Sequence, residues 1–247
     1  MVGIKLTRGN TGRETLWDTN DPQDVGNQVH QLTGLIDSLV SSGRFDSPLN
    51  AVEHVTVAAQ GLFMLIEELQ RIPSASLEGV LFRGRSWGDN LTPPSGFGVP
   101  PNQRPSRFNG VGEFALYLSR SEAVVRDELS QTSQTNTSTN YWVQRFVVQP
   151  AGLKLLRLNP TSCASYPALN QFTIMFERPF DPQRTHPHIG MQLLRTVCID
   201  VGFDAIEYPT VTGEFSSEIL ATNVAVLTEK AINICIEAKD GDPYLLA

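Results

Sequence analysis

The stretch RFNGVGEFALYLSRSEAVVRDEL, residues 107–129, carries three unlike functional groups on one predicted loop, strand and helix. Two glycines follow Arg107 within five residues and interrupt any regular element there. Apolar and smaller residues then alternate over 114–119, which is the period of a half-buried strand. Tyr117 falls on the face of this strand opposite the apolar row, and Glu128 follows on the next element.

A helix is expected directly after this strand. Ser119 and Glu122 have the form of a capping box, so we predict a helix over 123–131. Glu128 lies four residues after one valine and three after the next, which puts it on the apolar stripe of that helix. A buried carboxylate near a helix C-terminus is costly and requires a polar partner. One explanation is a structural ion pair between Glu128 and Arg107, with the tyrosine filling an edge strand; the other is a functional site.

The spacing of these three residues is specific. Arg107 precedes Tyr117 by ten residues, and Tyr117 precedes Glu128 by eleven. With RFN and a following glycine, this spacing resembles the RES-domain family, and the resemblance extends over residues 77–236. RES domains are toxins of toxin–antitoxin pairs that resemble ADP-ribosyltransferases in fold and cleave the nicotinamide–ribose bond of NAD. The resemblance implies an NAD-degrading enzyme, with NAD as substrate rather than cofactor and with a neutralising antitoxin as partner.

The resemblance gives each of these residues a role. Glu128 would stabilise the oxocarbenium-like ribose that forms as neutral nicotinamide leaves. Arg107 would hold the diphosphate, Tyr117 would stack on nicotinamide or cap the site with its hydroxyl, and Asn109 would help to bind the substrate. Water and inorganic phosphate both stay open as the acceptor, so the motif fits a glycohydrolase or a phosphorylase.

Further candidate residues flank this stretch. Arg83 follows an apolar run in a predicted strand over 79–85, and a guanidinium there could hold a phosphate or lie solvated at the edge of a sheet. A glycine, an apolar strand and Tyr-Pro lead to Thr210, where the RES family has its serine. Threonine keeps the hydroxyl and adds a methyl group. Ser216 and Ser217 are rival candidates for the place of that serine.

Composition restricts the class of protein. The 247 residues have a formal charge of −7 and 40% hydrophobic content, enough for a substantial core. The negative charge argues against general binding of nucleic acid or acidic membranes. No apolar run reaches the roughly 18 residues of a membrane-spanning helix, and the N-terminus lacks the apolar segment of a signal peptide. We therefore expect a cytoplasmic protein without nucleic-acid or membrane partners.

Metal binding is not expected. The three cysteines are widely spaced and are best interpreted as buried, reduced thiols: Cys163, Cys198 and Cys235. His186 and His188 are separated by a proline at a predicted helix start, a poor arrangement for sharing a metal ion.

The chain divides into two predicted parts. Residues 1–76 comprise a polar arm and a helical hairpin whose helices start at Asp21-Pro22 and Ser47-Pro48. Residues 77–247 form the RES-like catalytic domain, with a helix near 189–201. We predict its further strands at 141–149, 153–158, 171–176, 203–209, 223–227 and 232–236. Several short strands with few helices and no βα repeat favour an α+β fold with an ADP-ribosyltransferase-like mixed sheet.

Two other functions stay open at this point. A protein ADP-ribosyltransferase that modifies arginine usually has a second Glu or Gln two residues before its catalytic glutamate, and here Arg126 occupies that position. A non-catalytic nucleotide-binding or interaction domain is the other alternative, and Thr210 is the feature that favours it. Composition does not decide whether the chain forms a homo-oligomer.

Overall fold

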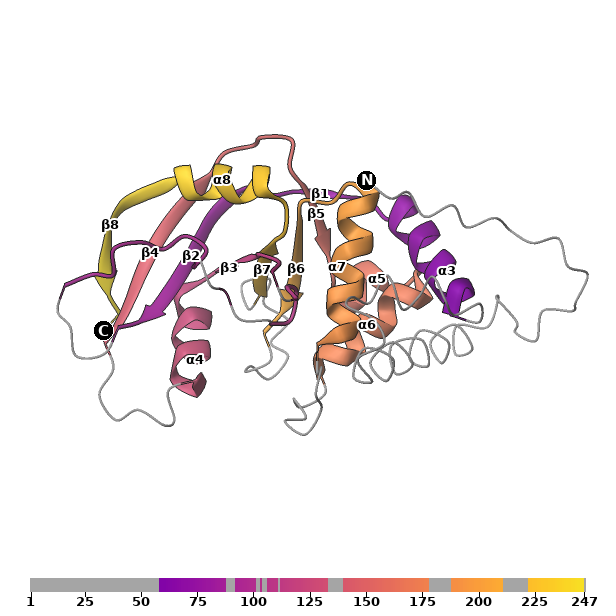
Figure 1. The fold of residues 1–247 in the computed structure, drawn as a ribbon, viewed down its shortest axis with the longest axis horizontal. Helices are drawn as coiled ribbons and strands as arrows, with labels where there is room; N and C mark the ends of the chain where they lie inside the picture. The colour runs from indigo at the N-terminus through magenta and orange to yellow at the C-terminus, as the bar shows by residue number, and fades with distance from the viewer. Residues whose placement is uncertain are drawn as a thin grey trace, which may run out of the picture.

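The structure, a computed structural model, describes residues 58–87, 92–100, 103, 106–110, 112–132, 140–177, 188–210 and 222–246. Within these residues a mixed eight-stranded sheet carries helices on both faces, which confirms the α+β class (Figure 1). The predicted arm and the first hairpin helix lie outside the described residues. The division of the chain at residue 76 stays a prediction.

The strands lie in the order β1-β5-β6-β7-β3-β2-β4-β8. Only β5 and β6 run parallel among the described strands. Their bounds are β1 Ala75–Ser76, β2 Gly79–Ser86, β3 Leu116–Ser119, β4 Tyr141–Val148, β5 Lys154–Arg157, β6 Ala205–Pro209, β7 Thr222–Val226 and β8 Lys239–Leu245. The predicted strands at 79–85, 114–119, 141–149, 153–158, 203–209 and 223–227 are confirmed with small shifts in their ends.

Helices cover the two faces of the sheet unequally. Alternate strand residues face one core shared with α3 (Ala58–Arg71), α5 (Pro160–Cys163), α6 (Pro167–Glu177) and α7 (Ile189–Val201). The other residues of the same strands face α8 (Glu229–Glu237) on the opposite side. The remaining helix, α4 (Glu122–Thr132), packs against β2. The predicted helix near 189–201 is confirmed, and Gly202 ends it with a left-handed φ of 97°.

The sheet opens between β2 and β3. These two strands share a single pair of facing residues, Phe82 and Ser119, whereas β2 pairs with β4 along its whole length. The strands therefore diverge beyond Phe82, toward Arg83 on β2 and toward Leu118 on β3. This divergence leaves room for a cavity between them.

Two predicted strands are helices. Residues 171–176 lie in α6 and residues 232–236 lie in α8. Both segments are rich in β-branched and aromatic residues, but capping groups select the helix. Glu68 accepts hydrogen bonds from the first amides of α6, and the Thr228 side chain accepts one from Ala231 N at the start of α8.

The predicted capping box is also wrong. The side chain of Ser121, not that of Ser119, accepts the cap hydrogen bond from Val124 N, so the helix begins at Glu122. Ser119 ends β3 instead, and its hydroxyl is used in the site described below. All three cysteines are reduced and buried, as expected. No helix within the described ranges is long and apolar enough to cross a membrane.

Candidate functional site

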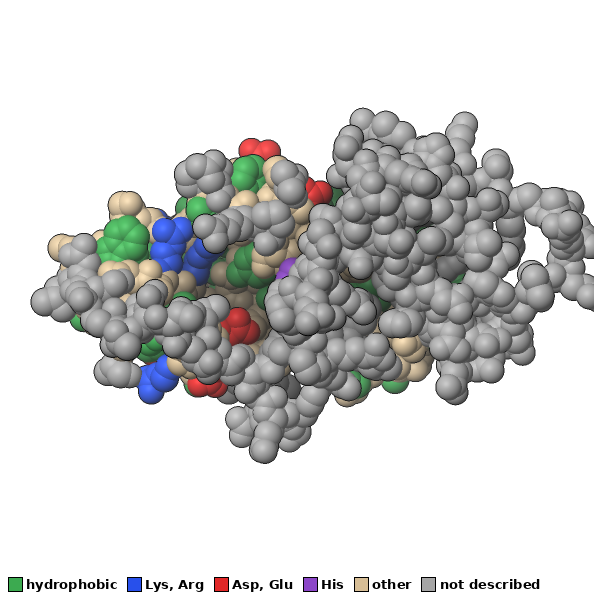
Figure 2. Space-filling view, turned by 60° about the horizontal axis from the view of Figure 1, so that its bottom comes forward, with side chains coloured by type: hydrophobic (Ala, Val, Ile, Leu, Met, Phe, Trp, Pro, Cys, Tyr) green, Lys and Arg blue, Asp and Glu red, His purple; other side chains and the backbone are tan. Residues whose placement is uncertain are grey.

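A cavity of about 320 Å³ fills the opening between β2 and β3. Its lining residues come from four strands, α4, the start of α7 and the loop before β3: Phe82, Arg83, Gly84, Ser106, Arg107, Tyr117, Leu118, Ser119, Val125, Glu128, Leu129, His188, Tyr208 and Asn223 on the described part of the chain. Figure 2 looks onto a face on which basic, acidic and histidine side chains surround a recessed area. The volume is at the lower end of the range for small-molecule sites, roughly 300–1,000 Å³.

Tyr117 holds the loop that carries Arg107 through two hydrogen bonds. The Tyr117 hydroxyl accepts a hydrogen bond from Phe108 N at 2.9 Å and donates one to Asn109 Oδ1 at 2.8 Å. Burial raises the pKa of Tyr117, although its bond from Phe108 opposes that shift. The hydroxyl therefore positions the loop, and the Tyr117 side chain also lines the cavity.

Asn109 is not one of the residues that line the cavity. Its side chain is fully buried and engaged by Tyr117. Gln192 of α7 also donates to the carbonyl oxygens of Ser106 and Asn109, at 3.0 and 3.2 Å. A contribution of Asn109 to substrate binding would therefore run through the shape of the loop.

The guanidinium of Arg107 lies over the aromatic ring of Tyr208. Its guanidinium carbon is 5.3 Å from the centre of the Tyr208 ring, which itself packs against Phe108 with the ring centres 5.0 Å apart. A guanidinium over an aromatic face is favourable and keeps its charge. Burial raises the pKa of Tyr208, so its hydroxyl stays neutral at physiological pH.

Glu128 points into the same cavity from α4, as the predicted apolar stripe requires. Its Oε1 accepts hydrogen bonds from Asn223 Nδ2 at 2.6 Å and from Thr210 Oγ1 at 3.4 Å. Thr210, predicted in place of the family serine, is thus in contact with Glu128. Ser216 and Ser217 lie outside the described residues.

Arg83 of β2 lines the same cavity as Glu128. Its Nη1 is buried and has no hydrogen-bond partner within the described ranges. Burial, with a smaller contribution from Arg85, lowers the pKa of Arg83 to about 10, so the guanidinium is still charged at neutral pH. A buried guanidinium nitrogen without a hydrogen-bond partner is costly, and an anionic ligand group would supply that partner.

His188 is a member of the site that the sequence did not predict. It occupies the N-cap position of α7 without a side-chain cap hydrogen bond, lines the cavity and lies near Arg107. Burial, assisted by Arg107, lowers its pKa to about 4, so the imidazole is neutral at physiological pH. The described residues hold no group of three side chains suited to a metal ion.

The fold of this chain is similar to that of a solved toxin structure, although its sequence matches no known family. No protein-family model and no curated protein matches the sequence. A chain of the crystal structure of the M. tuberculosis MbcT–MbcA toxin–antitoxin complex matches with a TM-score of 0.49 and 15% sequence identity. The match covers 74% of this chain and 92% of that chain.

Five of the predicted residues meet at one place. Arg83, Arg107, Tyr117 and Glu128 line the cavity, and Thr210 reaches Glu128 from beside it. Arg126, at the position that matters for an arginine-modifying transferase, is exposed on the solvent side of α4.

Proposed function

We propose that this chain cleaves the nicotinamide–ribose bond of NAD and acts as a growth-arresting toxin with a neutralising antitoxin. The observation that carries the proposal is one cavity lined by a carboxylate, two guanidinium groups and two tyrosines. Their sequence spacing resembles that of RES domains. The positive side would receive the diphosphate, and the carboxylate would lie beside the ribose.

The residues have distinct tasks in this reaction. As the bond between ribose C1′ and the pyridinium nitrogen breaks, the electron pair leaves with nicotinamide, and positive charge develops on the ribose. Glu128 stabilises that charge, and its effect is largest where water is excluded. Asn223 and Thr210 fix the carboxylate through Oε1. A water molecule, which gives up a proton to the solvent, or a phosphate oxygen then bonds to C1′.

Arg83 and Arg107 would share the diphosphate. The buried Nη1 of Arg83 lacks a partner on the described chain, and phosphate oxygens match a guanidinium well. Neutral His188 adds a hydrogen-bonding group without adding charge near Arg107. The expected affinity for a dinucleotide therefore comes from the two arginines.

The test is direct. Purified protein incubated with NAD should release free nicotinamide, measured by chromatography, and ADP-ribose or ADP-ribose 1″-phosphate identifies the acceptor in buffers without and with phosphate. Expression in a bacterium without the antitoxin should lower cellular NAD before growth stops. Intact NAD after prolonged incubation with folded protein, together with normal NAD in arrested cells, would reject the proposal.

A further inference from the structure

Two short hydrogen bonds connect Glu128 to a buried pair of polar side chains. Ser119 Oγ donates to Asn223 Oδ1 at 2.6 Å, and Asn223 Nδ2 donates to Glu128 Oε1 at 2.6 Å. Ser119 and Asn223 are 7% and 4% exposed, so water contributes little to their hydrogen bonding. The residues lie on β3, β7 and α4, three elements that meet at the cavity.

The order of donors in this chain is determined. A carboxylate only accepts hydrogen bonds, so the amide must present Nδ2 to Glu128. In this orientation the amide oxygen is turned toward Ser119, whose hydroxyl donates to it. The bond to Glu128 is therefore charge-assisted, and it is lost if the carboxylate is turned away.

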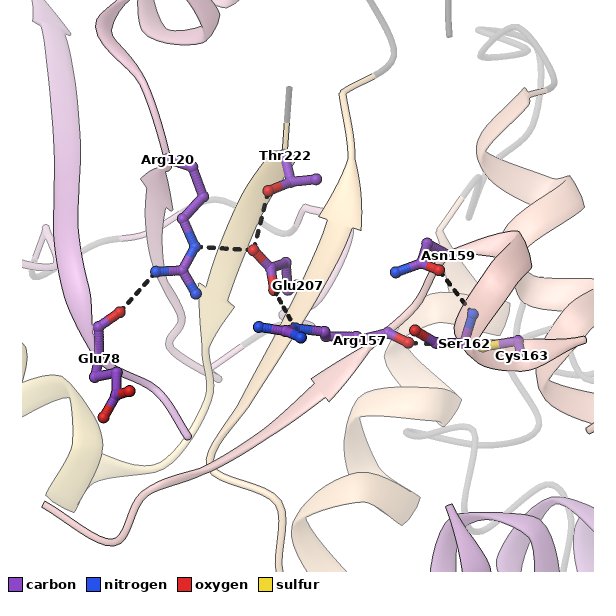
Figure 3. A network of polar contacts seen from close by, with 8 residues as sticks. All are labelled: Glu78, Arg120, Arg157, Asn159, Ser162, Cys163, Glu207 and Thr222. Atoms are coloured by element: carbon purple, nitrogen blue, oxygen red, sulfur yellow. Dashed lines mark hydrogen bonds and ion pairs between the residues drawn. The ribbon is translucent and has the colours of Figure 1, made fainter. Parts of the chain in front are cut away.

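The two strands are held in place from the opposite face of the sheet. Arg120 follows Ser119 and Thr222 precedes Asn223, so their side chains point away from the cavity. Arg120 Nε and Thr222 Oγ1 both donate to Glu207 Oε1, at 2.8 and 3.0 Å (Figure 3). Glu207 is nearly buried and also pairs with Arg157 of β5.

Arg120 of this network also connects the end of β3 to the start of β2. Arg120 Nη1 donates to the carbonyl oxygen of Glu78, just before β2, at 2.7 Å (Figure 3). This bond lies on one side of the Phe82–Ser119 pair, and the strands diverge on the other. Ser119 and Asn223 are therefore anchored at the point from which the cavity opens.

We propose that Asn223 is a positioning residue that directs the Glu128 carboxylate into the cavity, with Ser119 holding the Asn223 amide in place. The proposal rests on the proposed function for the role of Glu128. The contacts of Asn223 with Ser119 and Glu128 can be tested without measuring catalysis. Asn223 acts through Glu128 and requires no contact with the reacting bond.

Asn223→Asp tests the proposal with almost no change in shape. Two carboxylates at hydrogen-bond distance cannot both ionise favourably, and a single shared proton restores a donor toward Glu128. At a pH of about 8 we expect the variant to lose about tenfold or more in kcat with little change in KM. As the pH falls toward about 5.5, the ratio of variant to parental kcat should rise.

Other ionisable groups face this cavity and are the same in both proteins, so the ratio isolates the new pair. They are Arg83 on β2, Arg107 on the loop, Tyr117 on β3, His188 on α7 and Tyr208 on β6. Asn233→Asp is the matched control, because Asn233 is exposed on α8, on the other face of the sheet. It adds the same charge and should leave the pH profile unchanged.

A thermal-melting cycle tests the contact independently of activity. Asn223→Asp should lower the melting temperature at pH 8, and adding Glu128→Gln should recover it because the glutamine amide can donate to the new carboxylate. Additive effects of the two changes, or a kcat ratio that does not vary with pH, would overturn the proposal. If the parental protein releases no nicotinamide, the proposed function fails, while the cycle still decides whether Asn223 and Glu128 are coupled.

Discussion

Both hydrogen bonds that Glu128 receives from Asn223 and Thr210 end on the same oxygen, Oε1. A glutamine at this position can accept both with its carbonyl oxygen, so Glu128→Gln removes the charge and leaves these bonds in place. We predict that nicotinamide release falls by at least about a hundredfold, the scale of losing one electrostatic stabiliser. NAD binding, measured by calorimetry, should change little.

The Glu128→Gln variant also distinguishes a catalytic role of Glu128 from a structural one. If Glu128 serves mainly to neutralise Arg107, the glutamine leaves that cation uncompensated and should cost roughly 3 kcal/mol or more of stability. Glu67→Gln on the exposed face of α3 is the control for loss of one carboxylate. A Glu128→Gln protein that melts early yet releases nicotinamide at the parental rate would contradict the catalytic role.

The neutral imidazole of His188 predicts a pH dependence of stability. Burial holds its pKa in the folded protein at about 4, below the value of an unfolded histidine. Between these two values the unfolded chain binds the extra proton, so stability decreases as the pH falls from about 6.5 toward 4. Chemical denaturation at a series of pH values should show this slope, and His188→Gln should reduce it. An equal slope in both proteins would mean that other groups dominate.

The sequence could predict which residues point inward, but it could not predict all of the residues that they contact. The alternation around Tyr117 and the helical position of Glu128 are local patterns, and both side chains line the cavity. Asn223 is 95 residues from Glu128 in the chain, and its contact depends on β7 pairing with β3. Local periodicity carries no information on such a pairing. The unsatisfied nitrogen of Arg83 likewise appears only once the fold has buried it.

At the scale of elements, Gly84 determines how closely α4 approaches β2. A Cβ at this position would overlap Val125 Cγ1 and lie 2.6 Å from Leu129 Cδ1. We predict that Gly84→Ala displaces α4, costs about 1–3 kcal/mol of stability and lowers nicotinamide release, because Glu128 moves with its helix. Urea denaturation and steady-state kinetics measure the two effects.

A matched glycine and a second-site change sharpen this experiment. Gly96 has open space where a Cβ would be, so Gly96→Ala should be close to neutral. Val125→Ala removes the nearest clash and should recover part of the activity lost in Gly84→Ala. An alanine at position 84 that behaves like the one at 96 would show that the helix is not held by this contact.

Element type could be predicted where a pattern is long or flanked by strong breakers. The helix at 189–201 ends at a glycine with positive φ, and its prediction is confirmed. The strand predictions at 171–176 and 232–236 are wrong because largely apolar segments of only five or six residues fit either element. For α6 the deciding group is Glu68, about 100 residues earlier in the chain, so the sequence around 171 could not reveal it.

At the scale of the whole molecule, α3 and β1 belong to the same packed body as the sheet. Glu68 of α3 accepts hydrogen bonds from Ala168 N and Leu169 N, at 3.1 and 2.9 Å. Burial raises the pKa of Glu68 despite these two bonds, so its position carries a cost that packing must offset. Because β1 also pairs with β5, this segment closes one edge of the sheet.

This packing predicts the outcome of truncation. Removing residues 1–76 deletes four apolar side chains of the core, Leu62, Leu65, Leu69 and Ile72, each of which contributes roughly 1.5–3 kcal/mol when buried. The loss approaches the whole stability of a domain, roughly 5–15 kcal/mol, and leaves the first amides of α6 unsatisfied. The full chain should therefore show a clear melting transition, whereas residues 77–247 should aggregate or melt without one. Circular dichroism and size-exclusion chromatography on the full chain and on the fragment compare them directly, and a 77–247 fragment as stable as the full chain would show that α3 is dispensable to the core.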